Sequence, residues 1–311
     1  MEINLLGNVE IRGHGRIHRL STSSGYCVLA ALALQPTTPI PATTLLDWLW
    51  LPSQQTDKSA GSLTRFVTEI RGAIEKAGGD RAWLRYSSGA RTYCLDIDAS
   101  LVDYHRFTRL ADTARVKADV EMFDRALALW RGKGEPLANV KSLWADRRRT
   151  DMKAVLRTVR HHLFEALLAT GKPEQVIQEL AYVVEESPTD EFMVDGLRAL
   201  AAAGRHVDIP EWTTRLTRLM DEIFSVAPAP ASVALAKRLT SDPGERALTP
   251  PVHRTIVGRS AISNVQHAEW TTPLHRTSIR AGNSSETCPD CDRWPTTGSE
   301  PACGIRHGRR W

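Results

Sequence analysis

Short apolar runs separated by turn residues make up the start of the chain. The runs Ile3–Leu6, Val9–Arg12 and Ile17–Leu20 are broken by a Gly-Asn turn and a Gly-His-Gly turn. Runs of this length between glycine turns are typical of strands joined by tight connections. The pattern therefore predicts a small antiparallel meander.

The hydrophobic positions that follow indicate helices. Ser21–Ser24 supplies N-cap residues for an apolar helix over Tyr26–Leu34, and a second short helix is expected from Pro41 to Trp50. A third helix is predicted from Asp57 or Lys58 to Ala77, where a Gly-Gly pair ends it.

The third helix carries the most information about function. Its apolar residues recur at three- and four-residue spacing, which places them on one buried stripe. The stripe consists of Leu63, Phe66, Val67, Ile70 and Ile74. The opposite face carries Lys58, Gly61, Arg65, Thr68, Glu69 and Gly72, with Thr64 and Arg71 on one flank.

Two further strands are expected after this helix, over Trp83–Ser87 and Arg91–Ile97, and they form a hairpin with Arg91 at its tip. A sheet, three helices and a terminal hairpin are the element order of a winged helix. In such a module one helix fits the major groove of DNA, and its outward side chains reach base edges and phosphates. The alternative from patterning alone is that Arg65 and Lys58 belong to an ordinary solvated helix face.

From Asp103 to about Leu239 nearly every segment has helical periodicity. The expected helices are Tyr104–Ala114, Ala118–Trp130, Lys141–Thr170, Pro173–Glu186, Glu191–Ala203, Glu211–Ile223 and Ser232–Leu239. Two junctions resemble each other at a distance of 33 residues, Leu167–Lys172 and Leu200–Arg205. A spacing of about 34 residues is that of tetratricopeptide units, which stack helix pairs and present a protein-binding surface. A generic helix bundle is the alternative.

Composition narrows the function. The 311 residues carry a formal charge of +4, and residues 1–97 hold ten Lys and Arg against eight Asp and Glu. Any DNA contact must therefore come from a few placed residues rather than from a bulk field. The start has no basic segment before an apolar run, and no apolar run approaches the roughly 20 residues that span a bilayer. Cys27 and Cys94 fit small core positions, so a cytoplasmic protein is expected.

The last part of the chain has a different composition. Residues 241–311 lose periodicity and gain Thr, Ser, Pro, Gly and Arg, which predicts a mostly disordered tail. Within it Cys288, Cys291, Cys303 and His307 offer the ligand types of a Cys₃His zinc site. The eleven-residue gap between Cys291 and Cys303 and the absence of a surrounding core argue against metal, and no metal is predicted.

The sequence was also searched for enzyme motifs and for clusters of basic residues or histidines. The chain has no phosphate-binding loop, no His-Glu-x-x-His motif and no Gly-x-Ser-x-Gly motif, so no enzyme and no cofactor are predicted. The run Arg147–Arg149 can contact DNA or an acidic partner, although a solvated face paired with Asp146 and Asp151 is the expected arrangement. The pair His161-His162 is expected on the surface rather than at a metal.

Several segments in order resemble the Streptomyces antibiotic regulatory protein family. The resemblance covers roughly residues 1–240. Its segments are Met1–Ile11, Leu45–Trp50, Leu63–Ile74, Leu95–Asp98, Asp103–Phe107 and Ala126–Gly132.

The resemblance implies a mainly α protein with three parts. These parts are an OmpR-type winged helix over 1–97, a TPR-like bacterial transcriptional activation domain over 98–240 and the tail over 241–311. It further implies a cytoplasmic, nucleoid-associated activator that binds promoter direct repeats of antibiotic biosynthesis genes as double-stranded DNA. Such an activator recruits RNA polymerase and can self-associate on DNA.

The resemblance also places DNA-binding positions on the third helix at Thr64, Arg65, Thr68 and Arg71. Arg65 and Thr68 are expected at base edges or phosphates, Arg71 and Lys58 at phosphates, and Arg91 on the wing. Trp48 and Phe66 are expected to be structural.

Two features depart from the family pattern. Thr68-Glu69 stands where a Ser-Arg pair is common, and the first helix starts with Ser23-Ser24-Gly25-Tyr26 rather than with basic or amide residues. A carboxylate that faces phosphate is repulsive, although Glu can accept a hydrogen bond from cytosine. An alternative function is therefore a degenerate family member that acts as a protein-interaction module with weak DNA binding or none.

Overall fold

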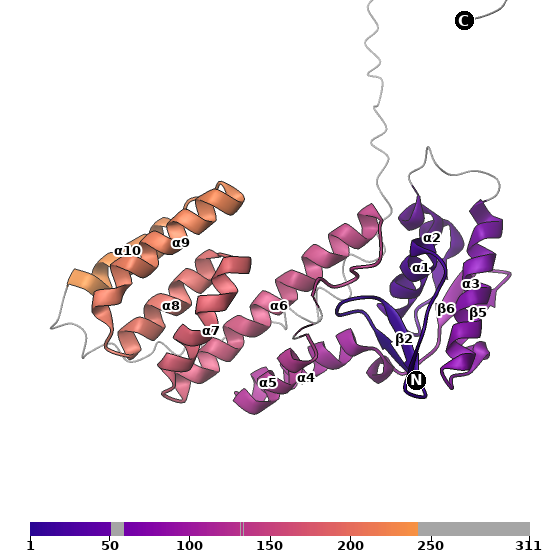
Figure 1. Cartoon of the computed structure of the whole chain (residues 1–311), viewed down its shortest axis with the longest axis horizontal. Coiled ribbons are helices and arrows are strands. Elements are labelled where there is room, and N and C mark those ends of the chain that lie inside the picture. Colours follow the sequence, from indigo (N-terminus) through magenta and orange to yellow (C-terminus); the bar gives the residue numbers. More distant parts are fainter. Residues whose placement is uncertain (51–58, 131, 133, 242–311) are drawn as a thin grey trace, which may run out of the picture. The chain divides into compact units, whose positions relative to one another are not determined.

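The structure, a computed structural model, describes residues 1–50, 59–130, 132 and 134–241. Its first part contains two three-stranded antiparallel sheets and three helices (Figure 1). The elements are β1 (Glu2–Asn4), β2 (Glu10–Gly13), β3 (Arg16–His18), α1 (Ser23–Ala33), β4 (Ile40–Pro41), α2 (Ala42–Leu49), α3 (Ser59–Lys76), β5 (Leu84–Ser87) and β6 (Thr92–Leu95). This order confirms the predicted winged helix.

The first sheet has the order β1-β2-β3, as the glycine turns predict, with Ile3 opposite Ile11 and Ile11 opposite His18. Helix α1 begins after Thr22, whose hydroxyl accepts a hydrogen bond from the Gly25 amide at 3.1 Å. This is the N-cap arrangement that a Ser/Thr run before an apolar helix favours. Helices α1, α2 and α3 pack against one another.

The second sheet contains a strand that the sequence pattern did not predict. Its order is β4-β6-β5, and the two-residue strand β4 pairs with β6 through Ile40 opposite Tyr93. The prediction placed Pro41 in a helix and left the hairpin two-stranded. Two residues carry no detectable alternation, so only the contact with β6 reveals this strand.

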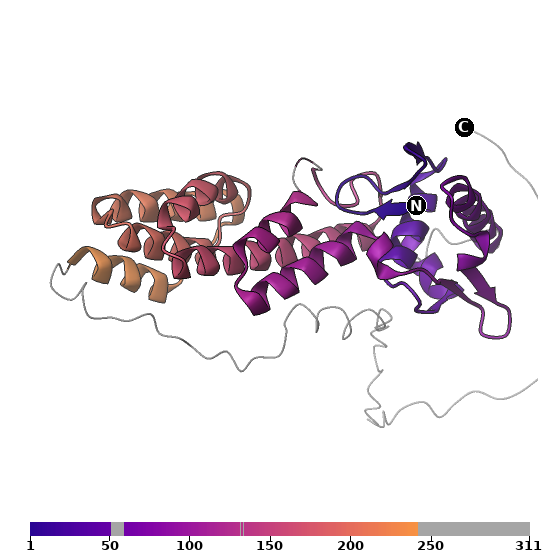
Figure 2. The ribbon, with the colours of Figure 1, turned by 90° about the horizontal axis from the view of Figure 1, so that it is seen from below.

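The second part is all helical, and every helix expected there is present. The helices are α4 (Asp103–Lys117), α5 (Val120–Ala128), α6 (Leu143–Ala169), α7 (Pro173–Glu186), α8 (Asp190–Ala202), α9 (Ile209–Phe224) and α10 (Pro230–Ser241). Helices α4 and α5 lie side by side next to α6 in both views (Figures 1 and 2). Helices α6 to α9 then pack consecutively, each on the next.

The two junctions that look alike in sequence have the same backbone geometry. Gly171 and Gly204 have φ of 72° and 71°. The amides of Lys172 and Arg205 donate to the carbonyls of Leu167 and Leu200 at 2.9 and 2.8 Å. Each junction is therefore a glycine C-cap in which orphan carbonyls at the helix end are satisfied. The similarity between the two junctions, 33 residues apart, therefore reflects a repeated helix-ending motif.

The predicted boundary between residues 97 and 98 is crossed by many contacts. One hydrophobic cluster contains buried residues of both parts, and both parts belong to one compact unit. Trp48 of α2 stacks on Trp144 of α6 with ring centroids 5.5 Å apart. Cys27 is buried, as predicted, and its thiol approaches the Ser142 hydroxyl at 3.5 Å. The winged helix is thus packed directly onto the helical part.

Several other predictions fall on residues outside the described ranges. These are Lys58, the tail after residue 241, and the four residues weighed as zinc ligands, Cys288, Cys291, Cys303 and His307. Within the described part of the chain, none of the helices combines the length and the apolar character needed to cross a membrane.

Candidate nucleic-acid interface

Helix α3 turns its apolar stripe into the core, as its periodicity predicts. Leu63, Phe66, Val67, Ile70 and Ile74 are at most 3% exposed. Thr64, Arg65 and Thr68 are exposed. The helix ends at the predicted glycine pair, where Gly78 has φ of 85° and the Gly79 amide donates to the Ile74 carbonyl at 2.9 Å. Three of the side chains predicted to contact DNA, Thr64, Arg65 and Thr68, therefore share an accessible face.

Arg65 is the central cation of this face. Its guanidinium carbon lies 5.5 Å from the centroid of the Phe66 ring, an arrangement that orients the side chain while leaving it accessible. One turn further on, the Thr68 hydroxyl donates to the Thr64 carbonyl at 2.9 Å. Phe66 is buried and Trp48 packs against the core, so both are structural, as expected.

Arg71 lies on the flank of the helix that faces the wing. Its Nε donates to the Leu84 carbonyl of β5 at 2.9 Å, and the side chain is partly buried. This hydrogen bond fastens α3 to the hairpin, a function that the sequence pattern did not reveal. A phosphate contact by Arg71, which stays a prediction, would have to use the terminal nitrogens of the guanidinium.

Glu69 does not lie where the sequence pattern placed it. It was expected on the outward face, next to Thr68. Instead it sits on the flank opposite Arg71, and its carboxylate accepts hydrogen bonds from the backbone amide and the hydroxyl of Ser21, the latter at 3.1 Å. Ser21 is 48 positions away in sequence, so local periodicity carries no signal of this contact.

The wing is the β5–β6 hairpin, with Arg91 exposed at its tip as predicted. Arg91 has φ of 52°, a left-handed conformation, and its carbonyl accepts a hydrogen bond from the Ala42 amide at 2.9 Å. The turn is thereby held against the start of α2. Sequence reasoning missed Tyr86, which is 46% exposed and stacks on Tyr93 at 4.7 Å. Alternation along β5 gave no signal of this exposure, because it places Tyr86 on the same face as buried Leu84.

The basic run at the start of α6 is mostly engaged within the protein. Arg148 pairs with Asp151 at 3.2 Å, and Arg149 pairs with Asp146. Arg149 also donates to the carbonyls of Leu137 and Val140, at 2.9 and 3.1 Å. The expected pairing is confirmed for Arg148 and Arg149, but the solvated face is not, because their side chains are only 18% and 14% exposed. Arg149 also fastens α6 to the segment before it.

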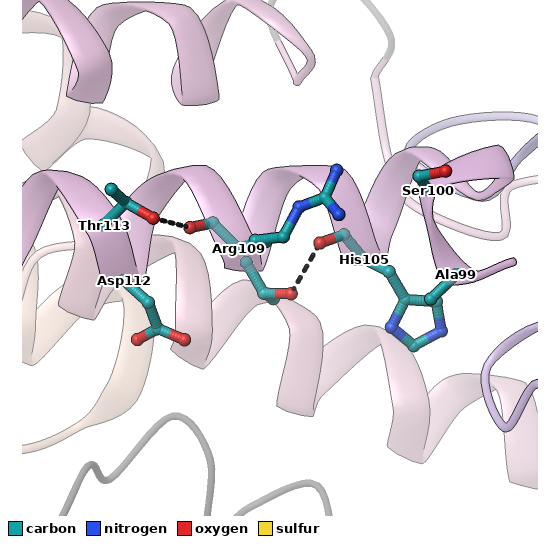
Figure 3. A pocket seen from close by; sticks show the side chains of 7 residues that line it. Ala99, Ser100, His105, Arg109, Asp112 and Thr113 are labelled. Atoms are coloured by element: carbon teal, nitrogen blue, oxygen red, sulfur yellow. Dashed lines mark hydrogen bonds between the residues drawn. The ribbon is translucent and has the colours of Figure 1, made fainter.

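The helical part contains a hollow of about 300 Å³ beside the start of α4. It is lined by Ala99, Ser100, His105, Thr108, Arg109, Asp112 and Thr113. Figure 3 shows the Arg109 guanidinium lying along the helix toward Ser100, whereas the His105 ring and the Asp112 carboxylate point away from it. His105 Nε2 is engaged with the Ala33 carbonyl at 3.0 Å, and burial lowers its pKa. These groups do not converge on one point, as a catalytic or metal-binding set would.

Three comparisons with known proteins agree with this architecture. The sequence matches the family described as "Bacterial transcriptional activator domain" over residues 101–240. It is 27% identical over 267 residues to "Regulatory protein DnrI" of Streptomyces peucetius, a match that covers 78% of this chain and 94% of that protein.

The fold is similar to that of Mycobacterium tuberculosis EmbR, solved in complex with a low-affinity phosphopeptide. The TM-score is 0.67 at 21% sequence identity, and the match covers 76% of this chain. The chain spans 64% of the length of EmbR. The activator-domain match and the similarity to DnrI support a transcriptional regulator of the Streptomyces antibiotic regulatory protein type, and the similarity to EmbR supports the fold.

Proposed function

We propose that this chain is a sequence-specific DNA-binding transcriptional activator. In this proposal α3 enters the major groove, with Arg65 and Thr68 at base edges or phosphates and Thr64 beside them. Arg71 and Lys58 contact phosphates, and Arg91 brings the wing to the neighbouring backbone. The observation that carries the proposal is the division of α3 into a buried stripe and an exposed face that includes Arg65.

The partners follow from the same reasoning. A near-neutral protein binds DNA through a few placed cations, and a promoter with direct repeats offers one such site to each of two copies. Stacked helix pairs such as α6–α9 supply an extended surface for a protein, for which we propose RNA polymerase. The targets we propose are antibiotic biosynthesis genes, in line with the family that the chain resembles.

The decisive experiment is a mobility-shift titration of Arg65→Ala on promoter DNA that carries direct repeats. Loss of a base-reading arginine costs about 1–3 kcal/mol, roughly a tenfold to hundredfold weaker affinity. Arg125→Ala is the matched control, because Arg125 is an exposed arginine on α5, paired with Glu121 at 3.9 Å. The control is expected to bind like the wild type.

Wild-type binding should also weaken steeply as salt rises, because phosphate contacts release counterions. Full affinity in Arg65→Ala would remove α3 from the interface. The absence of any shift at micromolar wild-type protein would instead favour the alternative, a module that acts through its helical repeats alone.

A further inference from the structure

The carboxylate of Glu69 occupies an unusual place for a negative charge on a DNA-reading helix. One oxygen accepts from the Ser21 amide, and the other accepts from the Ser21 hydroxyl at 3.1 Å. Ser21 immediately precedes Thr22, the residue that caps α1. Glu69 therefore connects the middle of α3 to the turn that starts α1.

Helical geometry places this connection opposite a second one. Successive residues of a helix are about 100° apart around its axis, so Glu69 and Arg71 lie about 200° apart. Arg71 is fastened to β5 through the Leu84 carbonyl. The exposed face with Thr64, Arg65 and Thr68 lies between these two attachments.

We propose that Glu69 is a positioning residue that fixes the rotation of α3 about its axis, so that Arg65 and Thr68 meet DNA in one orientation. An apolar stripe packs without strong directional preference, whereas a carboxylate held by an N–H and an O–H group is directional. This inference rests on the proposed function, because it concerns how α3 is presented to DNA.

The proposal and simple charge repulsion predict opposite changes in DNA affinity when the Glu69 carboxylate is removed. If Glu69 faced phosphate, its removal would tighten binding to DNA. If Glu69 positions α3, Glu69→Ala weakens binding by about tenfold, as expected for losing two hydrogen bonds that orient the reading face. Glu69→Gln keeps an acceptor for the Ser21 amide and should bind within about threefold of the wild type.

Matched variants distinguish the loss of the Glu69–Ser21 contact from the loss of a negative charge on α3. Glu75→Ala removes a carboxylate from the same helix, where Glu75 pairs only with exposed Arg81, at 3.1 Å, so its binding should be unchanged or slightly tighter. Ser21→Ala removes only the hydroxyl donor and should weaken binding less than Glu69→Ala does. Each variant is titrated on the same DNA probe, and thermal unfolding confirms that it is folded.

A measurement without DNA completes the test. Hydrogen exchange of the Ser21 amide in the free protein should accelerate in Glu69→Ala and not in Glu75→Ala. Unchanged exchange, Glu69→Ala binding at least as tight as the wild type, or Glu69→Gln as weak as Glu69→Ala would each overturn the positioning role. Wild-type protein that shifts no DNA would overturn the proposed function itself, whatever the exchange rates are.

Discussion

The carboxylate of Asp103 is completely buried and accepts hydrogen bonds from two consecutive backbone amides, Leu5 at 2.7 Å and Leu6 at 3.2 Å. Its neighbours in the family-like segment serve the same junction. His105 engages the Ala33 carbonyl at the end of α1, and Arg106 pairs with Glu2. At the residue scale, this segment is the attachment of the helical part to the winged helix.

His161 is a second residue whose position differs from the expectation, since it was predicted on the surface. It is only 25% exposed, and its Nδ1 lies 2.8 Å from the carboxylate of Asp195, a fully buried residue of α8. Hydrogen bonding to Asp195 raises the pKa of His161 above its ordinary value of 6.5, and Glu165 and Glu191 act in the same direction. Burial of the imidazole opposes the shift.

Because the pKa of His161 is raised in the folded protein, the stability that His161 contributes depends on pH in a defined direction. The stabilisation from His161 is fully present below the pKa of the unfolded chain and is lost as pH rises through the folded-state pKa. We expect the free-energy difference between the wild type and His161→Gln, measured by urea unfolding from about pH 5 to pH 9, to be largest in acid and to shrink in alkali. His105 titrates in both proteins and cancels, whereas the pKa of His162, which the neighbouring His161 charge lowers, rises in the variant. Parallel profiles would contradict this prediction.

At the element scale, helix interiors contain glycines in two different environments. A β-carbon added at Gly61 or Gly72 of α3 would meet nothing within 4 Å, so these glycines only weaken the helix. A β-carbon at Gly196 of α8 would lie 2.2 Å from the ring of Trp212, whose Nε1 donates to the Met193 carbonyl. Here glycine permits the close approach of α8 and α9.

These environments predict opposite effects of the same substitution. Gly72→Ala should stabilise the protein by about 0.5–1 kcal/mol, because alanine has the higher helix propensity and space is available. Gly196→Ala should destabilise it by about 1–3 kcal/mol, because the tryptophan ring must shift. Urea unfolding of the two variants measures both values. A loss of stability in Gly72→Ala would show that α3 is packed on its outward side.

Elements differ in how well local sequence predicts them. The helices α4 to α10 were found within a few residues, because each repeats its apolar spacing over successive turns. Helices α5, α6 and α8 also begin with a side-chain N-cap. Strand β4 was missed because its two residues are defined only by pairing with β6. The outward face of α3 was likewise predictable, and the flank position of Glu69 was not.

For the whole molecule, the winged helix depends on residues beyond its predicted end. The amides of Leu137 and Ala138 donate to the carbonyls of Leu5 and Gly7, each at 3.0 Å. The Asn139 side chain exchanges two hydrogen bonds with the backbone of Val9, at 2.7 and 3.0 Å. The first sheet and the segment before α6 are therefore parts of one structure.

This dependence predicts the behaviour of fragments. A fragment of residues 1–97 should lack cooperative unfolding, because it leaves the amides of Leu5 and Leu6 without the Asp103 carboxylate and uncovers their side chains. A fragment of residues 1–241 retains every contact described here and should unfold in one cooperative transition. Circular dichroism during heating measures both. Cooperative unfolding of the shorter fragment would show that its sheet is self-sufficient.

The sequence by itself determined the helices, their glycine ends, the winged-helix order and the exposure of Arg65, because periodicity and capping act between residues a few positions apart. Only the tertiary structure decided the partners of Glu69, Asp103, His161 and Asn139. Each of these polar side chains bonds to a residue at least 34 positions away, and such a partner leaves no local pattern. The physical reason is that apolar burial follows from spacing, whereas a hydrogen bond requires a specific donor and acceptor brought together by the fold.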